Sequence, residues 1–272
     1  MNKQATILGA IAGDTIGSVY EFNPTKDYNF KLLTPQMAPT DDSLMTIAIA
    51  KWLLDDSQMQ EECLARTLRH IGRTYPCPLG GYGGMFKEWL SSDIGPYNSW
   101  GNGSAMRVSA CGWYFDTLEE TLEAAKRSAE VTHNHPEGIK GAQATAAAIF
   151  LARTGKSKDE IKEYIQTTFG YDLSRNYDEI KRTYHFKGSC QETVPESIIA
   201  FLESNDYVDA VRLTIALGGD ADTMGAITGA IASAYYGGIP EEIYDFVLPR
   251  IPDDLREITL QFENAIESKR NN

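Results

Sequence analysis

Residues 223–236 read TMGAITGAIASAYY, a run of small and apolar side chains in which Gly225 and Gly229 are four residues apart. The same spacing recurs near the start of the chain, in the run GAIAGDTIG from Gly9 to Gly17. Glycine costs a helix about 1 kcal/mol relative to alanine, so repeated glycine on one helical face favours close backbone contact. We therefore predict that these two segments are helices that cross near the centre of the molecule.

Helical spacing of apolar residues extends over much of the remaining chain, and strand-like alternation is nearly absent. The further predicted helices are Leu44–Leu54, Glu119–Val131, Gly138–Arg153, Glu196–Glu203, Tyr207–Leu217 and Asp253–Lys269, besides Thr223–Tyr236 itself. The polar segment Tyr171–Glu192 is expected to run over the surface. Because no break in composition marks a linker, the sequence predicts one all-α domain over residues 1–272, a compact orthogonal bundle of many helices.

Composition excludes several classes of function. The formal net charge of −13 makes direct nucleic-acid binding unfavourable, because that affinity comes mainly from lysine and arginine. No apolar run in the sequence approaches the roughly 20 residues that span a bilayer. The four cysteines are scattered and form no Cys-x-x-Cys pair, so we expect reduced thiols in a cytoplasmic protein. We also expect a monomer.

Two short acidic runs each precede a predicted helix: TDDS at residues 40–43 and GGDADT at residues 218–223. Ordinary N-capping would account for one acid or hydroxyl at each helix start, but not for two acids. If the two helix starts meet, like charges about 4 Å apart would cost on the order of 4 kcal/mol per pair. Such a cluster requires a divalent cation, and its carboxylate and hydroxyl oxygens favour Mg²⁺ or Mn²⁺ over zinc.

The two acidic runs resemble the paired metal motifs of the ADP-ribosylglycohydrolase family. Further motifs follow in the family's order. Gly13–Glu21 resembles its N-terminal signature, Gly81–Gly83 its first glycine loop, Gly101–Arg107 its most distinctive run, and Thr132–His133 its histidine segment. The resemblance extends from Gly9 to about Gly237.

The resemblance implies an all-α fold around a central binuclear metal site and the release of ADP-ribose from a modified protein or small molecule, with arginine slightly favoured as the modified residue. It implies two Mg²⁺ or Mn²⁺ ions held by Thr40, Asp41, Asp42, Asp220, Asp222 and Thr223. Catalytic roles are implied for Glu21, Asp41 and Asp222, with Glu21 as a gate or general acid/base.

Contacts with ADP-ribose are implied for Gly81, Gly83, Ser99, Trp100, Gly101, Asn102, Gly103 and His133. An acidic protein can hold a diphosphate with the bare backbone N–H groups of such glycines. Trp100 is expected either to pack on the ligand or to lie in the core. Arg107 is expected to form a buried salt bridge with an acid such as Asp14 rather than to clamp a phosphate.

Two other functions are compatible with these residues. A metal-dependent hydrolase of the nucleotide diphosphate would release AMP instead of ADP-ribose. A non-catalytic ADP-ribose-binding or crystallin-like structural protein would release neither, although the presence of every matched acidic ligand disfavours it.

Overall fold

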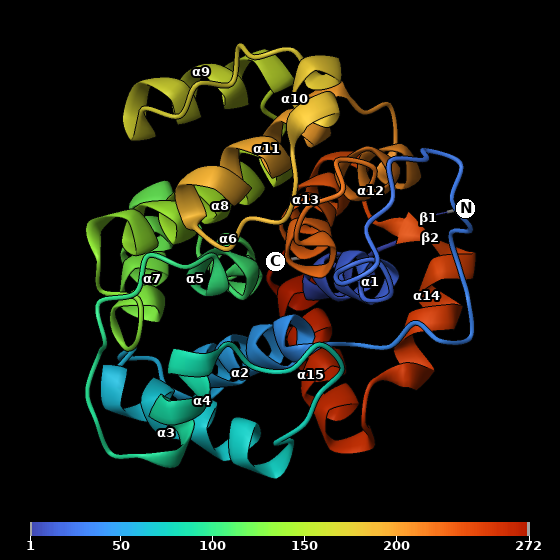
Figure 1. Ribbon diagram of the computed structural model, residues 1–272. Helices are drawn as coiled ribbons and strands as arrows, with labels where there is room; N and C mark the ends of the chain where they lie inside the picture. Colours follow the sequence, from blue (N-terminus) through green and yellow to red (C-terminus); the bar gives the residue numbers. More distant parts are fainter. Residues whose placement is uncertain (1, 271–272) are drawn as a thin grey trace.

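The computed structural model describes residues 2–270. Two helices of small residues, α1 (Ile7–Gly17) and α13 (Ala221–Tyr236), cross at its centre (Figure 1). A Cβ atom added to Gly13 would lie 1.9 Å from the carbonyl oxygen of Gly225, and one added to Gly225 would lie 2.3 Å from the carbonyl oxygen of Gly13. Only glycine permits this approach, so the predicted crossing is confirmed.

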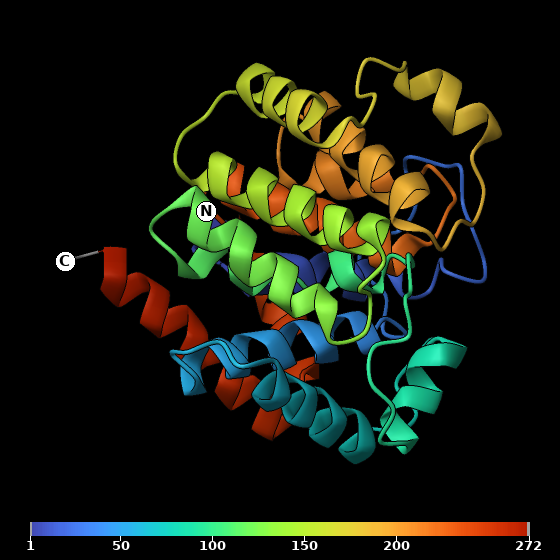
Figure 2. The ribbon, with the colours of Figure 1, turned by 90° about the vertical axis from the view of Figure 1, so that its left-hand side faces the viewer.

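Other helices cover this central pair on two sides. On one side, α8 (Pro136–Arg153), α11 (Cys190–Glu203) and α12 (Tyr207–Ile215) pack against α13 (Figure 1). On the other side, α2 (Asp41–Asp55) packs against α1 and against the last helix, α15 (Asp253–Arg270). Figure 2 shows α7 (Leu118–Glu130), α8 and α9 (Lys158–Phe169) lying side by side.

The remaining elements complete the bundle. They are β1 (Asn2–Lys3), α3 (Glu61–Thr74), α4 (Gly84–Ser91), α5 (Gly103–Met106), α6 (Ser109–Tyr114), α10 (Tyr177–Thr183), β2 (Ile239–Pro240), α14 (Glu241–Val247) and the 3₁₀ turn Leu248–Arg250. The strands within residues 2–270 are these two, which pair antiparallel. The all-α class is confirmed.

Every predicted helix is present, and most ends agree within two residues. Two helix starts differ by more: α2 begins at Asp41, three residues before Leu44, and α11 begins at Cys190 instead of Glu196 and continues through Pro195. Proline lacks a backbone N–H and is unfavourable inside a helix, so the local pattern did not indicate that α11 extends before Pro195.

The last helix caps the first. The Glu263 carboxylate of α15 accepts hydrogen bonds from the backbone N–H groups of Thr6, at 2.7 Å, and Leu8, at 3.1 Å. These N–H groups begin α1, whose N-cap residue Thr6 makes no side-chain cap of its own. A carboxylate at a helix N-terminus also interacts favourably with the helix dipole.

Over residues 2–270, no helix combines the length and the apolar character needed to cross a membrane. All four cysteines are free thiols, as expected from their spacing.

Candidate active site and metal centre

A pocket with a volume of about 410 Å³ opens where the N-termini of α2 and α13 meet. The sequence-predicted residues that line it are Glu21, Asp41, Asp42, Gly81, Gly83, Ser99, Gly101, Asn102, Gly103, His133, Asp220, Asp222 and Thr223. Two predicted residues lie elsewhere. Thr40 is fully buried beside the acidic cluster, and Trp100 is 52% exposed, with its ring 5.4 Å from that of His135.

The acidic side chains form two overlapping groups. Carboxylate oxygens of Asp14, Asp42 and Asp222 lie within 4.8 Å of one another, and so do those of Glu21, Asp220 and Asp222. Asp222 belongs to both groups and therefore joins them. The fold thus brings together residues from α1, α2, the start of α13 and the loop after α1.

Asp14 orders the start of α2. Its Oδ2 accepts hydrogen bonds from the backbone N–H groups of Thr40 and Ser43, at 3.0 and 3.1 Å, and from the Ser43 hydroxyl. Its Oδ1 accepts a 2.7 Å bond from the Thr40 hydroxyl. The Thr40 hydroxyl also lies 3.1 Å from Oδ2 of Asp42, and its oxygen accepts the Asp42 N–H, which leaves one lone pair of that oxygen for another partner.

The two helix starts are capped differently. Thr40 is the N-cap residue of α2, and its hydroxyl oxygen accepts the backbone N–H of Asp42. Asp220 occupies the N-cap position of α13 without a side-chain cap bond. Ordinary capping therefore explains Thr40 but leaves the three acids Asp42, Asp220 and Asp222 unexplained.

Burial and mutual repulsion hold protons on this cluster. Burial, followed by the charge of Asp222, raises the pKa of Asp14 to about 7 and that of Glu21 to about 8. The same two causes, in the same order, raise the pKa values of Asp41, Asp42 and Asp220 well above their usual range. Without a counter-charge, these carboxyl groups cannot all ionise at neutral pH.

Two oxygens of the cluster, Oε2 of Glu21 and Oδ1 of Asp42, are buried without a hydrogen-bond partner in residues 2–270. A buried polar oxygen without a partner costs free energy unless an ion or water satisfies it. The donor atoms here are all oxygens, which are the ligands that Mg²⁺ and Mn²⁺ prefer. The residues present therefore fit a hard divalent cation.

The first glycine loop forms an open wall of the pocket. Gly80 and Gly81 have φ values of +80° and +86°, which favour glycine. A Cβ atom added to Gly81 or Gly83 would meet nothing within 4 Å, so space for a ligand lies beside this loop. Gly83 is the N-cap residue of α4 and offers no side-chain cap, which leaves N–H groups of the first turn available at the pocket wall.

The second glycine loop is already hydrogen-bonded within the protein. The N–H of Gly101 donates to the Ser99 hydroxyl at 3.1 Å, and the N–H of Asn102 donates to the Gly188 carbonyl at 2.9 Å. The Asn102 side-chain amide donates to Oδ2 of Asp220 at 2.7 Å. This loop thus orients an acidic residue of the cluster and offers fewer free N–H groups than its glycines suggested.

The expected salt bridge between Arg107 and Asp14 is wrong. Arg107 is 1% exposed, and its hydrogen bonds within residues 2–270 go to a carbonyl and a hydroxyl rather than to an acid. Its guanidinium instead donates to the Ser128 carbonyl at 2.8 Å and to the Thr132 hydroxyl at 2.7 Å. The four hydrogen bonds that Asp14 accepts from Thr40 and Ser43 replace an arginine as its partner.

The core placement considered for Trp100 is also wrong, because its side chain is half exposed beside the loop Ser99–Gly103. Contact of Trp100 with a ligand stays a prediction. His133, in contrast, is buried at the pocket wall, where a Cβ atom added to Gly103 would lie 3.0 Å from its Nε2.

The sequence analysis did not include Asp14 among the site residues. Its position could have indicated a functional role, since Asp14 is the single charged residue in the otherwise uncharged helix α1.

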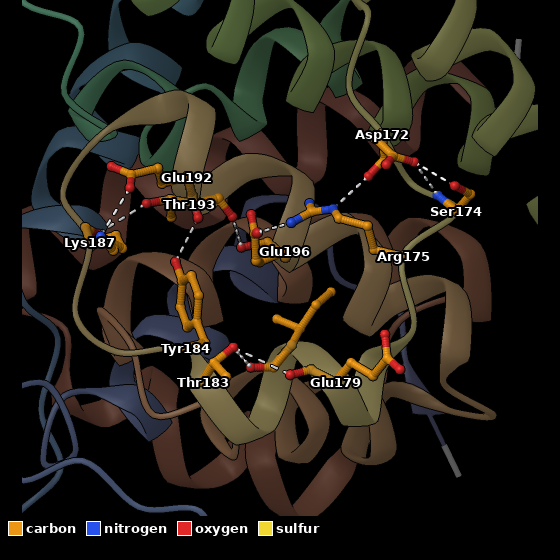
Figure 3. A network of polar contacts seen from close by, with 12 residues as sticks. Asp172, Ser174, Arg175, Glu179, Thr183, Tyr184, Lys187, Glu192, Thr193 and Glu196 are labelled. Carbon is orange, nitrogen blue, oxygen red and sulfur yellow. Dashed lines mark hydrogen bonds and ion pairs between the residues drawn. The ribbon is translucent and has the colours of Figure 1, made fainter.

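The segment Tyr171–Glu192 also contributes to the site, although the sequence suggested only a surface excursion. Ion pairs fasten the segment to α11: Arg175 to Glu196 at 2.6 Å, and Lys187 to Glu192 at 3.1 Å (Figure 3). Its end then reaches the pocket, which Phe186 and Gly188 line. The local sequence pattern did not indicate that the segment reaches the pocket, because its position is set by tertiary contacts with α11.

A model of the family described as ADP-ribosylglycohydrolase matches residues 3–272. The chain belongs to the ADP-ribosylglycohydrolase family. It is accordingly an enzyme of the class that hydrolyses glycosyl bonds.

Two curated relatives and one solved structure illustrate the similarity. ADP-ribosylhydrolase ARH3 of Homo sapiens is 26% identical over 309 residues, covering 85% of this chain and 84% of that protein. ADP-ribosylarginine hydrolase Tri1 of Pseudomonas putida is 25% identical over 270 residues, covering 88% and 72%. A solved structure described as an ADP-ribosylglycohydrolase-related protein complex shares the fold, with a TM-score of 0.73, 24% identity and 96% of each chain covered.

Proposed function

We propose that this glycohydrolase uses divalent cations to cleave the bond between ADP-ribose and a modified arginine side chain, releasing ADP-ribose. The observation that carries the proposal is the pair of buried, unpartnered carboxylate oxygens on Glu21 and Asp42, in a pocket with an open glycine wall. Thr40, Asp41, Asp42, Asp220, Asp222 and Thr223 would hold two Mg²⁺ or Mn²⁺ ions, with Asp14 orienting Thr40.

The reaction joins a water oxygen to the anomeric carbon of the distal ribose and breaks the bond from that carbon to the guanidine nitrogen. The proton lost by the water balances the one gained by the leaving nitrogen. Bound divalent cations would supply neutralisation of the carboxylates and orientation of the ribose hydroxyls and the water. The transition state of glycosyl transfer resembles an oxocarbenium ion, which the surrounding carboxylates stabilise.

Glu21 is our candidate for the proton transfer. It lies in the loop after α1 rather than on a helix, it lines the pocket, and its Oε2 has no partner. A carboxylate placed in this way can take a proton from the water and give it to the leaving nitrogen.

The diphosphate would lie along the wall formed by Gly81, Gly83 and the first turn of α4. The N-terminus of a helix attracts an anion through its free N–H groups and its dipole. This feature matters here because Arg107 is the one arginine or lysine among the described residues that line the pocket, and its guanidinium already binds Ser128 and Thr132.

Arginine is the preferred modified residue because two bacterial relatives, from Pseudomonas putida and Serratia proteamaculans, are named ADP-ribosylarginine hydrolases. Their identities to this chain, 25% and 24%, are close to the 26% of human ARH3. The cytoplasmic location and the monomeric state stay predictions.

The test is an assay of the purified protein on arginine-linked and serine-linked ADP-ribosylated peptides, with Mg²⁺, with Mn²⁺ and with EDTA. We expect intact ADP-ribose to be released from the arginine-linked peptide, and EDTA to abolish its release. Activity on the serine-linked peptide alone would reverse the choice of residue. Release of AMP would identify a diphosphate hydrolase, and ligand binding without turnover would identify a non-catalytic binder.

A further inference from the structure

A continuous chain of buried hydrogen bonds joins Arg107 to the histidine of the pocket. The guanidinium Nη2 of Arg107 lies 2.7 Å from the Thr132 hydroxyl, which lies 2.8 Å from Nδ1 of His133. These three side chains are 1%, 0% and 5% exposed. None of them belongs to the acidic cluster, and the proposed hydrolysis assigns Arg107 and Thr132 no task.

The direction of these hydrogen bonds follows from the donors available. An arginine can only donate, so the Thr132 oxygen accepts from Arg107. The Tyr97 hydroxyl is also in hydrogen-bond contact with Thr132, and when it donates to the Thr132 oxygen beside Arg107, both lone pairs of that oxygen are filled and its one proton is directed to Nδ1 of His133. Nδ1 is therefore unprotonated, and a neutral imidazole in this state carries its proton on Nε2.

The groups around His133 favour the neutral ring. Burial, followed by the Arg107 charge, lowers the pKa of His133 well below its usual range. Tyr97 also faces this cluster, with its ring centroid 5.8 Å from that of His133, and the buried thiols of Cys111 and Cys190 lie near Arg107. Burial raises the pKa of Tyr97 to about 12, so its hydroxyl keeps its proton and can donate it to the Thr132 oxygen.

Nε2 faces the second glycine loop. A Cβ atom on Gly103 would lie 3.0 Å from Nε2 and one on Gly101 would lie 3.7 Å away, so glycine keeps this side of the ring uncovered. All three residues line the pocket. A proton on Nε2 is thus directed to the place where a ligand oxygen can accept it.

We propose that Arg107 and Thr132 are positioning residues that fix His133 as a neutral imidazole with its proton on Nε2, ready to donate to an oxygen of ADP-ribose. The identity of the ligand rests on the proposed function, whereas the tautomer does not. A neutral donor of fixed direction gives the same hydrogen bond at every pH at which the fold persists, and it adds no second cation beside Arg107.

The tautomer is tested by ¹⁵N nuclear magnetic resonance of the imidazole rings in the full-length protein without ligand. The chain has four histidines, so the spectrum of His133→Gln identifies the His133 signals by their loss. We expect protonated Nε2 and unprotonated Nδ1 in the wild type. A proton on Nδ1, or on both nitrogens, at neutral pH would overturn the proposal without any variant.

Thr132→Val removes the hydroxyl at nearly constant shape, and the ring should then shift towards the tautomer with its proton on Nδ1. Thr132→Ser restores a hydroxyl and should restore the wild-type signals. Thr121→Val is the matched control, because Thr121 is equally buried but its hydroxyl donates to the Thr117 carbonyl within α7. It should leave the His133 signals unchanged.

Calorimetric titration with ADP-ribose then distinguishes the positioning of His133 by Thr132 from a general loss of structure. Thr132→Val should weaken binding about tenfold, the loss expected for one well-placed hydrogen bond. In the His133→Gln background, where the amide nitrogen stands near the Nε2 position, Thr132→Val should have no further effect. An equal loss in both backgrounds would show a merely structural role. If the wild type failed to bind ADP-ribose, the proposed function would fail while the tautomer measurement would still stand.

Discussion

At the scale of single residues, Asp222 is the centre of the acidic cluster, because it belongs to both carboxylate groups and is the first charge that raises the pKa values of Asp14 and Glu21. Glu21 belongs to only one group and has an unpartnered oxygen. The two residues should therefore separate the binding of metal from the transfer of a proton.

We expect Asp222→Asn to make the metal-free protein more stable, because it removes repulsion, and to reduce both the rise in Tm on adding Mn²⁺ and the turnover. Glu21→Gln keeps an oxygen and should retain most of the rise in Tm, yet lose about 10²- to 10⁴-fold in turnover. Calorimetry and the peptide assay measure the two effects. Recovery of Glu21→Gln activity at higher metal concentration would show that Glu21 is a ligand or gate instead.

Asn102 provides a second prediction at this scale. Its amide orients Asp220 through a 2.7 Å hydrogen bond, so Asn102→Ala should lower metal affinity about 10- to 100-fold, as is typical when a partner of a metal ligand is lost. Titration with Mn²⁺ measures the change. Ser99→Ala is the control, because Ser99 braces the same loop without contacting an acid. Equal metal affinity for both variants would argue against this role of Asn102.

At the scale of elements, the crossing of α1 and α13 builds the site. Asp14 follows Gly13 on α1, and Asp222 lies one turn before Gly225 on α13. The close approach of these two glycines therefore also sets the distance between the two acids. Packing at the centre and the geometry of the candidate metal centre depend on the same contact.

Gly13→Ala should consequently destabilise the protein by about 3 kcal/mol or more, because its Cβ atom would overlap the backbone of α13. Urea unfolding measures the loss, and variants that still fold should bind Mn²⁺ more weakly. Gly95→Ala is the control, since a Cβ atom there would meet nothing within 4 Å. A loss for Gly13→Ala no larger than for Gly95→Ala would contradict the packing argument.

At the scale of the whole molecule, buried acids make stability depend on pH. Burial raises the folded-state pKa to about 7 for Asp14, about 8 for Glu21 and about 7 for Glu263, from ordinary values of 3.8, 4.5 and 4.5. Between each pair of values the folded protein binds more protons than the unfolded chain. The free energy of unfolding therefore falls as the pH rises through this window.

For the metal-free protein, we expect the free energy of unfolding to fall by at least about 2 kcal/mol between pH 5 and pH 8. Saturating Mn²⁺ should reduce the part of this fall that is due to Asp14 and Glu21, because cations beside Asp222 would offset the negative charge that helps to raise both pKa values. The part of the fall in unfolding free energy that is due to Glu263 should persist when metal is bound, since Glu263 caps α1 outside the pocket. This part should disappear in Glu263→Gln. A flat profile without metal would contradict this account.

The sequence by itself determined the all-α class, the course of most helices, the crossing of the two glycine-rich helices and the acids at the starts of α2 and α13. These features follow from local periodicity, from glycine spacing and from helix-start chemistry, all of which act over a few residues. Only the tertiary structure decided that Asp14 joins the acids, that Arg107 binds Thr132 instead of an acid, and that the end of the segment Tyr171–Glu192 reaches the pocket. Each of these depends on which groups from distant elements meet in a buried space, where every polar atom requires a partner.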